Sequence, residues 1–530
     1  MNCPICESNQ LTKKGTIELA SGTIKQRYKC KDCGEHFSVA HADEHTEDMF
    51  AEEVEHVFDL TEFRYERSEA WLKSNVYSHD RLIITAAQCN TPVDQDFLSA
   101  IDTYRKHKPA GLIAIPIKYK TVNSQDDSSV DMYDESIEQF LCENTLTFSE
   151  CNVKVYAGLK IQATAENPLS GLDPLSKGWT VIVGHAQVQL KTLPNLDKRI
   201  SDILTTTGAI TEKNYSKTKL GEKARFNHSL SALVIEFVGE TYHLRHLNYS
   251  PETKSFWDIE TEYRADGTTH TESVEALVTG DEHALFRDPV VENFTYTDAN
   301  SLVNTLKPKY IVRHDVLDFY SGSHHHAKNI FVKFAKHHAC TDDVELEVLK
   351  TIDYINDTTP AFSTSLIVKS NHNEHLLRWL NEVDIQVEPW NAKFYHLLMY
   401  MMLSNTKLGD NGSEYPDPFE LYSTPRLKKN VSFIQREYRI CDIVVGMHGD
   451  IGINGARGSF VGFSRLPNKS IVGHSHSPRI EKGCYVVGTS SKLQLEYNKG
   501  ASTWHHAHCV IHPNGKRQLI FIKHEGWRLI

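Results

Sequence analysis

The C-terminal half of the chain contains five polar clusters, and most of them directly follow a short apolar run. The runs at residues 310–312 and 365–368, for example, have the length and composition of buried β-strands. Polar side chains at the carboxyl ends of such strands meet at one edge of an open α/β sheet, where ligand sites usually form. In chain order, the clusters are Gly280-Asp281-Glu282-His283, His314-Asp315-Val316-Leu317-Asp318, Ser370-Asn371-His372, Gly446-Met447-His448 and Gly473-His474-Ser475-His476.

Carboxylates, an amide and several imidazoles that converge at one edge suit a pair of divalent metals. Ligands rich in oxygen and nitrogen favour Mn²⁺, Mg²⁺ or iron over ions that prefer sulfur. Two metals about 3.5–4 Å apart are a common device for hydrolysing phosphate esters. The five clusters therefore predict a two-metal phosphoesterase site.

Length and composition limit the class of protein. A chain of 530 residues exceeds one ordinary core, so we expect two or three domains. No apolar run reaches the ~18–20 residues that cross a bilayer, and the N-terminus lacks the basic and apolar regions of a secretory signal. We therefore expect a cytoplasmic protein without a membrane partner. The net charge of -12 is unfavourable for nucleic-acid binding, although the carboxylates of a metal site contribute to it.

Four of the eleven cysteines form two CxxC pairs near the N-terminus. Cys3 and Cys6 are separated by 23 residues from Cys30 and Cys33, a spacing typical of a tetrahedral four-cysteine zinc site. We therefore expect a zinc ribbon over residues 1–38 with one structural Zn²⁺. The ribbon resembles those of transposase-type DNA-binding proteins, which implies a contact with DNA. A zinc ion that merely folds a small unit is the alternative.

Residues 39–79 are predicted to form a helical linker. Apolar side chains at Phe50, Val54, Val57 and Phe58 indicate one helix, and a second short helix is expected over residues 69–73. A helix-turn-helix and a plain connecting hairpin both fit this pattern, and the hairpin is favoured.

Residues 80–265 repeat part of the pattern of residues 266–530. The first segment opens with a strand at 81–85, a helix at 94–106 and a strand at 111–115, the same order as in residues 277–312. Residues 181–187 also match residues 470–476. A duplication explains these matches, and coincidence between two generic α/β segments is the alternative.

The first copy, if there are two, lacks the metal ligands. Ala87, Cys89 and Gln187 stand where the second copy has Asp281, His283 and His476. Such a copy would serve as a packing partner, a substrate platform or an oligomer surface. Its basic stretch at residues 213–225 is a candidate DNA-contacting loop, with an ordinary solvated loop as the alternative.

The five clusters resemble, in their order, the motifs of the calcineurin-like metallophosphoesterase superfamily. That superfamily includes protein phosphatases, phosphodiesterases and nucleases of the SbcD type, and its pattern is DxH, GDxxD, GNH(D/E), H and GHxH. The resemblance covers about residues 270–480. It implies a layered α/β fold with a β-sandwich flanked by helices, which the repeat would duplicate. Residues 80–265 would form a degenerate domain and residues 266–530 the catalytic one.

The resemblance also assigns roles to individual residues. The first metal would be bound by Asp281, His283 and His476, and the second by Asn371, His448 and His474. Asp315 would bridge the two metals. His372 would protonate the leaving oxygen, with Asp318 orienting it.

Four further residues bear on these assignments. Independently of the resemblance, Arg457 follows a glycine-rich stretch and is a candidate clamp for a substrate phosphate, with a structural turn as the alternative. Compared with the family pattern, His314 and Ser370 replace glycines and Asn373 replaces an acid. None of the three replaces a predicted ligand, so activity is still expected, although the first two would crowd the site.

The chain is also similar to the large pre-early DNA-degradation proteins of T5-like bacteriophages. The similarity runs from about residue 80 to the end and is carried by residues 82–88, 166–172 and 446–459. It implies a metal-dependent DNase that acts on host DNA in the bacterial cytoplasm. The protein could act as a homo-oligomer. A phosphatase for protein or nucleotide monoesters is one alternative. A DNA-binding regulator that keeps the fold as a scaffold is another.

Overall fold

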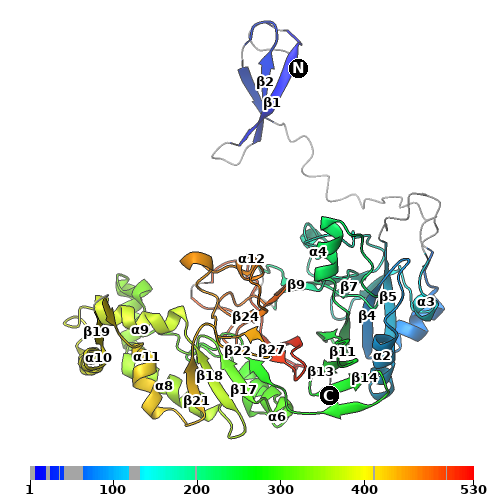
Figure 1. Ribbon diagram of the computed structural model, residues 1–530. Coiled ribbons are helices and arrows are strands. Elements are labelled where there is room, and N and C mark those ends of the chain that lie inside the picture. Colours follow the sequence, from blue (N-terminus) through cyan, green and yellow to red (C-terminus); the bar gives the residue numbers. More distant parts are fainter. Residues whose placement is uncertain are drawn as a thin grey trace. The chain divides into compact units, whose positions relative to one another are not determined.

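The computed structural model of the protein describes residues 6, 8–18, 24–34, 36–40, 64–118, 132–196, 200–409, 412–496 and 498–529. The chain forms two compact units, Met1–Glu62 and Phe63–Ile530. The larger unit is mixed α/β with several sheets (Figure 1). In these described ranges, every helix is too short or too polar to cross a bilayer.

The small unit is a three-stranded antiparallel sheet, β1 (Leu11–Glu18), β2 (Ile24–Cys30) and β3 (His36–Ala40). Cys6, Cys30 and Cys33 form a group whose sulfur atoms lie within 4.8 Å of one another. A hydrogen bond from the main-chain N–H of Cys33 lowers the pKa of Cys30 to about 6. This favours the thiolate, the form that binds metals. Cys3 and the expected helix around Phe50 lie outside the described residues.

A ten-stranded sheet runs through the larger unit and contains strands from both halves of the sequence. Its order is β22 (Arg439–Ile440), β23 (Ile443–Val444), β24 (Ser470–Val472), β26 (Cys484–Val486), β25 (Arg479–Glu481), β9 (Gln189–Thr192), β10 (Ile203–Thr206), β8 (Thr180–Val183), β7 (Val153–Tyr156) and β6 (Thr145–Phe148). The central pair β25–β9 is antiparallel, and the strand pairings on its two sides match. The next strand on each side, β26 or β10, is antiparallel to its inner neighbour, and the one after it, β24 or β8, is parallel. The sheet therefore has an internal two-fold arrangement.

Each half contributes a further sheet, and these two sheets also correspond. The first has the order β12 (Thr241–Asn248), β11 (Ser231–Val238), β4 (Arg81–Gln88) and β5 (Gly111–Ile117). The second has the order β21 (Val431–Ile434), β18 (Thr364–Val368), β17 (Tyr310–Arg313), β16 (Ala276–Val278), β27 (Ala507–Ile511) and β28 (Arg517–Phe521). In both, a parallel pair (β4–β5, β16–β17) continues into an antiparallel strand (β11, β27). The repeat in the sequence thus has a counterpart in the topology.

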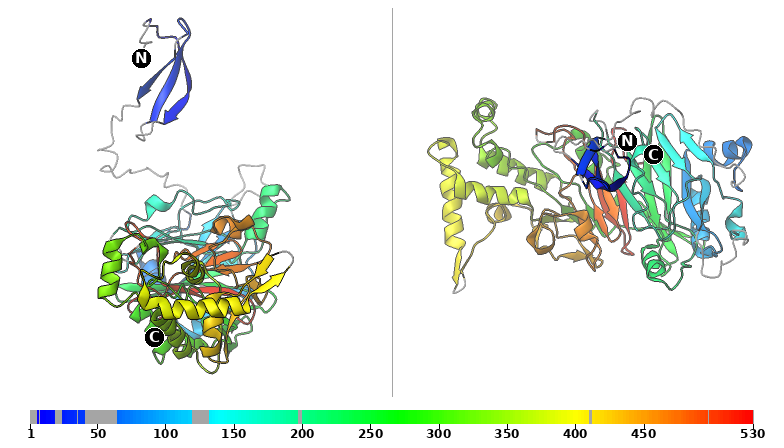
Figure 2. Two further views of the ribbon diagram at one scale, coloured as in Figure 1. Left: turned by 90° about the vertical axis from the view of Figure 1, so that its left-hand side faces the viewer. Right: turned by 90° about the horizontal axis from the view of Figure 1, so that it is seen from above.

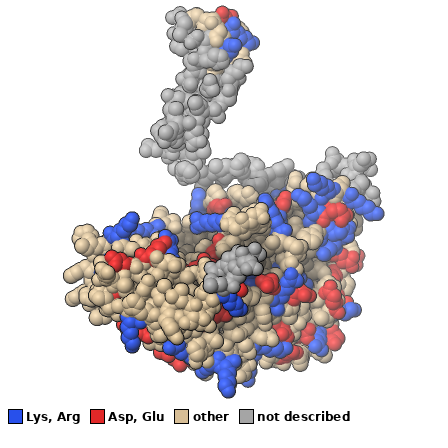
Figure 3. All heavy atoms as spheres, turned by 60° about the vertical axis from the view of Figure 1, so that its left-hand side comes forward, with Lys and Arg blue, Asp and Glu red and all other residues tan. Residues whose placement is uncertain are grey.

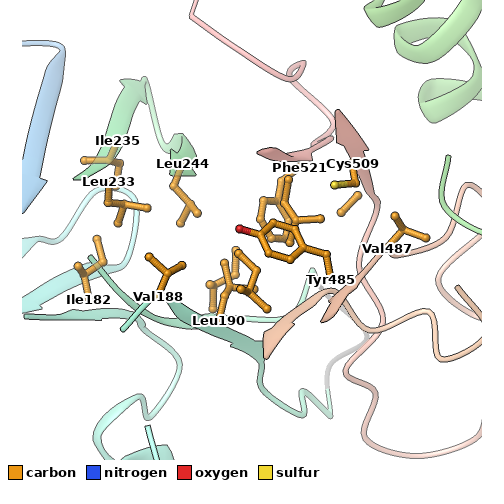
Figure 4. Packing of buried hydrophobic residues seen from close by; sticks show 14 of the residues in the cluster. Ile182, Val188, Leu190, Leu233, Ile235, Leu244, Tyr485, Val487, Cys509 and Phe521 are labelled. Atoms are coloured by element: carbon orange, nitrogen blue, oxygen red, sulfur yellow. The ribbon is translucent and has the colours of Figure 1, made fainter. Parts of the chain in front are cut away.

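The two halves share one apolar core between the sheets. Figure 4 shows Leu190 and Leu244 of the first half next to Tyr485 and Phe521 of the second, and Ile182 and Leu233 farther along the same cluster. Burying one large aliphatic or aromatic side chain contributes about 1.5–3 kcal/mol. Separating the halves would expose these side chains, so the halves depend on each other for stability.

Several local expectations are confirmed, and one is wrong. The strands at 81–85 and 111–115 are β4 and β5, and the helix at 94–106 is α2 (Gln95–His107). The short helix near residue 69 is α1 (Glu69–Leu72), which continues as a π-helical turn, η2 (Lys73–Tyr77). The basic stretch at 213–225 is not simply a loop, because Thr218 caps a helix there, α4 (Lys219–Asn227).

The second half carries an arm of helices beyond β18 and β21, on the left in Figure 1 and in the view from above in Figure 2. Its members are η5 (His324–His326), α7 (Ile330–His338), α8 (Val344–Asp357), α9 (Asn371–Glu382), α10 (Ala392–Asn405) and α11 (Pro418–Ser423). Figure 3 turns this side forward and shows a broad area without charged side chains. Exposed apolar residues of the arm include Phe331, Phe334, Tyr400 and Leu403.

Candidate metal centre

The loops after β16, β17 and β24 bring the predicted ligands of the first metal together. The ligand atoms of Asp281, His283, Asp315 and His476 all lie within 4.8 Å of one another, and all four side chains are buried. His476 Nε2 is 3.0 Å from Asp281 Oδ2 and 3.1 Å from His283 Nε2. This part of the expected ligand set therefore converges.

His448 also lies close to these carboxylates. Its Nε2 is 3.3 Å from Asp315 Oδ2, and it forms a second potential ligand group with Asp281 and His314. The main-chain N–H of His474 donates to Asp281 Oδ2 at 2.7 Å, and its ring lies 5.2 Å from that of His448. Asp315 Oδ2 thus lies close to both histidines, 3.3 Å from His448 Nε2 and 3.8 Å from His283 Nε2, and the bridging role of Asp315 stays a prediction.

Asn371 is the first residue of α9, which Ser370 caps by accepting a hydrogen bond from the N–H of Asn373. Ser370 therefore has a structural reason to replace the glycine of the family pattern. The side-chain oxygen of Asn371 is buried and makes no hydrogen bond with any described residue.

The backbone at this site adopts an uncommon conformation. His283, Asp315, His474 and His476 have φ angles of 40°, 47°, 69° and 56°. Left-handed conformations of residues with a side chain cost of order 1–3 kcal/mol each and cluster at functional sites. Gly473 is required for a different reason, because a Cβ there would lie 2.2 Å from Asp281 Oδ1.

The site carries strong electrostatic perturbations. Burial alone would lower the pKa of His283 and of His448, but the neighbouring carboxylates raise both to about 9. Burial alone would raise the pKa of Asp281, whereas the charges of His448 and His476 lower it to about 2. Asp281 and Asp315 are therefore held ionised in a buried place, and without a metal the protonated rings of His283 and His448 balance their charge.

The residues of this cluster are compatible with a bound metal. One oxygen each of Asp281 and Asp315 is buried without a hydrogen-bond partner among the described residues, as is that of Asn371. Buried polar atoms without partners are costly unless an ion or water satisfies them. His283 Nδ1 lies 2.9 Å from Asp318 Oδ1, and in the neutral ring this bond leaves the lone pair on Nε2, which faces the site.

Asp318 supports two rings, in a way that differs from the sequence prediction. Its carboxylate binds His283, whereas its main-chain carbonyl accepts the hydrogen bond from His372 Nδ1 at 2.7 Å. The predicted orientation of His372 therefore involves the backbone of Asp318. His372 Nε2 faces the site, 4.0 Å from Asp315 Oδ2.

His314 lies within the centre, in one potential ligand group with Asp281 and His448. Its Nδ1 lies 3.5 Å from His448 Nδ1, and burial lowers its pKa to about 4, so the ring is neutral near pH 7. Arg457 lies in the exposed stretch before α12 (Phe460–Phe463), and its role as a phosphate clamp stays a prediction.

Two residues of the centre were not singled out from the sequence. Glu282 and Arg313 are fully buried and form an ion pair beneath the ligands, 3.0 Å between Oε2 and Nη1. The only local signal was an acid and a base next to the ligand clusters, which alone does not indicate that they pair.

Among the described residues of the first half, no group of potential metal ligands corresponds to this centre. Ala86 donates its N–H to Gly208 O as Asp281 does to Gly488 O, so Ala86, one residue before the expected Ala87, takes the place of Asp281. His185 corresponds to His474, but both of its ring nitrogens are engaged by the main chain, at Gln162 O and at the N–H of Gln187. Neither His185 nor Gln187 has a positive φ. The positive φ angles therefore occur at His474 and His476, which are predicted ligands, and not at the corresponding residues of the first half.

Comparison with known proteins identifies a relative. No family model matches the chain, and no solved structure matches it. The chain is 31% identical over 458 residues to Protein A1 of Escherichia phage T5, an alignment that covers 84% of this chain and 82% of that protein. With this identity over most of both chains, the protein belongs to the family of the phage T5 Protein A1.

Proposed function

We propose that the protein is a divalent-metal-dependent phosphodiesterase that hydrolyses DNA, with a centre of the metallophosphoesterase type. The observation that carries this proposal is the buried convergence of Asp281, His283, Asp315, His448 and His476, with carboxylate oxygens that lack partners among the described residues. Structural ion pairs rarely leave such oxygens unsatisfied, whereas metal sites require them.

Asp281, His283 and His476 would hold one cation, Asn371, His448 and His474 the other, and Asp315 would face both. When bound, two divalent cations supply Lewis acidity and make a water acidic enough to ionise near neutral pH. His372 in its protonated form would give the Nε2 proton to the leaving oxygen and become the neutral ring that keeps its proton on Nδ1, where it donates to Asp318 O. Oxygen and nitrogen donors favour Mn²⁺ or Mg²⁺.

Two observations support DNA as the substrate. The relative is a phage protein, which suits a role in taking over an infected cell. The Cys6, Cys30 and Cys33 thiols suit a zinc ion, with Cys3 as the fourth ligand, and zinc ribbons often contact nucleic acids. Degradation of host DNA in the bacterial cytoplasm is the role that these observations favour.

The test compares wild-type protein with Asp315→Asn and with Glu374→Gln, a matched control on α9 whose carboxylate lies 3.9 Å from Arg436. Supercoiled plasmid and p-nitrophenyl phosphate are offered with Mn²⁺. We expect plasmid cleavage by wild type and control, and a loss of about 10²–10³-fold or more in Asp315→Asn. Hydrolysis of the monoester without plasmid cleavage would show that the protein is a phosphomonoesterase and would contradict the proposal. Cleavage that survives in Asp315→Asn would refute the assigned centre.

A further inference from the structure

A hollow of about 570 Å³ lies between the two halves, and none of the metal-centre residues lines it. The first half contributes residues around the end of α4 and the end of β12, including Phe226 and Tyr249. The second half contributes the residues before β24 and the turn between β27 and β28, including Lys469 and Lys516. The hollow is therefore a product of the packed repeat.

The walls of this hollow are strongly basic. Five cationic residues line it against a single carboxylate, Glu252; they are Lys213, Lys469, Lys482, Lys516 and Arg517. Burial lowers the pKa of Lys516, and the positive charges of its neighbours, Lys469 first among them, lower it further. Among the described residues, no carboxylate lies within ion-pair distance of Lys469 or Lys516. An anion in the hollow would relieve this repulsion.

Arg517 is fixed in the wall rather than free to move. Its guanidinium donates to Ser470 O and to Gly483 O, both at 2.8 Å, and lies 3.9 Å from the ring centre of Tyr485. Lys482 is paired with Glu166 at 2.8 Å. Of the five cations, Lys213, Lys469 and Lys516 have no ion pair with a described carboxylate, and the charge of Lys469 acts directly on Lys516.

The repeat supplies an internal control for this charge. The corresponding hollow on the other side of the two-fold arrangement, about 690 Å³, is lined by the β11–β12 turn and by the residues before β8. Among the described residues that line it, the acidic ones are Asp173, Asp202, Glu240 and Glu525, against Lys177 and Lys523. Since the described lining at the same place in the fold carries the opposite charge balance, the fold itself does not require the lysines of the first hollow.

An exposed aromatic side chain joins the basic hollow to a second, adjacent one. Phe226, at the end of α4, is 84% exposed and lines both hollows, together with Asn227 and Lys482. The adjacent hollow adds Lys219 and Lys223 of α4, together with Glu222 and with Glu166, which pairs with Lys223 and Lys482. Lysines beside an exposed aromatic ring are the combination that binds single-stranded nucleic acid, because phosphates meet the cations and bases stack on the ring.

We propose that the two joined hollows form a polynucleotide-binding site separate from the metal centre, in which Lys469 and Lys516 contact phosphates and Phe226 stacks on a base. This site would hold a strand away from the point of cleavage. Free phosphate or a mononucleotide carries the same chemistry, so the test separates these sources. Because binding is measured without added divalent metal, its outcome is independent of the proposed hydrolysis.

The test uses the full-length protein and a fluorescently labelled single-stranded oligonucleotide, titrated by anisotropy at several salt concentrations. Lys469→Glu/Lys516→Glu is compared with Lys177→Glu/Lys350→Glu, which changes the net charge equally from outside the basic hollow. We expect the first pair to weaken binding at least about tenfold and to reduce the salt slope by about 0.7 per lost phosphate contact. Phe226→Ala should weaken binding about five- to hundredfold.

Equal binding by the two double variants would overturn the proposal. An oligonucleotide that binds no more tightly than deoxyadenosine monophosphate or inorganic phosphate would also overturn it in favour of a small anion. Lys469→Ala/Lys516→Ala introduces no new charge and therefore controls for misfolding of the glutamate variant. Its melting temperature should equal or exceed that of the wild type, because the repulsion between the two lysines is removed.

Discussion

Glu282 and Arg313 form a fully buried ion pair that joins the two loops of the candidate centre. Glu282 lies between Asp281 and His283, and Arg313 is two residues before Asp315, so the pair fixes ligands from both loops. Glu282 also accepts hydrogen bonds from the hydroxyls of Thr279 and Tyr296, while Arg313 donates to Ser365 Oγ and to Thr358 O. The pair acts through position, since neither side chain reaches the site.

The first prediction concerns this pair. Arg313→Met should lower the free energy of unfolding by about 3–5 kcal/mol, because it leaves Glu282 charged and buried without its partner. The double variant Glu282→Met/Arg313→Met should lose less than the sum of the single changes. Arg378→Met, which removes an exposed pair with Glu382, should cost no more than about 1 kcal/mol. Urea denaturation measures these three variants and Glu282→Met, and a loss below about 1 kcal/mol in Arg313→Met would count against this role.

A second prediction follows from the approach of Gly473 to Asp281. Gly473→Ala would place a methyl group 2.2 Å from Asp281 Oδ1, so the carboxylate must move and Mn²⁺ binding should be lost. Gly483→Ala is the matched control, because its Cβ would meet nothing closer than 4.0 Å. Calorimetric titration with Mn²⁺ distinguishes the two variants. Wild-type affinity in Gly473→Ala would contradict the assignment of Asp281.

A third prediction concerns pH. His512 is stacked on Trp257, neither ring nitrogen has a partner among the described residues, and burial lowers its pKa to about 3. The unfolded chain binds a proton at this residue below pH 6.5, whereas the folded chain stays neutral. Stability present above pH 6.5 is therefore lost as the pH falls. At pH 5, the loss from this residue is about 2 kcal/mol.

His512→Phe should remove that part of the loss while leaving stability at pH 7.5 nearly unchanged. Chemical denaturation at the two pH values measures the difference. If wild type and variant lose the same free energy between pH 7.5 and pH 5, His512 is not buried in the neutral form.

A fourth prediction tests the shared core. The fragment 266–530 should not unfold cooperatively, because Leu190, Leu233 and the other first-half side chains of the core would be missing. The fragment 63–530 should melt cooperatively, since it contains the whole larger unit. Calorimetry on both fragments decides the matter, and a cooperative transition in 266–530 would show that the second half is independent.

Local signals allowed much of the centre to be predicted. Buried strands such as β17 are recognisable from short apolar runs, and the polar residues that follow them meet at one sheet edge. This reasoning found Asp281, His283, Asp315, His448 and His476.

Features that depend on contacts distant in sequence could not be found in this way. Glu282 and Arg313 are 31 residues apart, and nothing local indicates that they pair. The continuous sheet across β25 and β9 joins segments almost 300 residues apart, so periodicity within either strand carries no sign of it. Thr218 was read as part of a loop because a single capping residue is a weak signal in a basic stretch.

The most direct test of the account is the rate of Mn²⁺-dependent phosphodiester cleavage on DNA by wild type and Asp315→Asn at equal, verified folding. The account predicts cleavage by the wild type that requires added Mn²⁺, and a rate lower by about 10²–10³-fold or more in the variant. Absence of cleavage by a wild type that binds Mn²⁺, or equal rates in the two proteins, would contradict it.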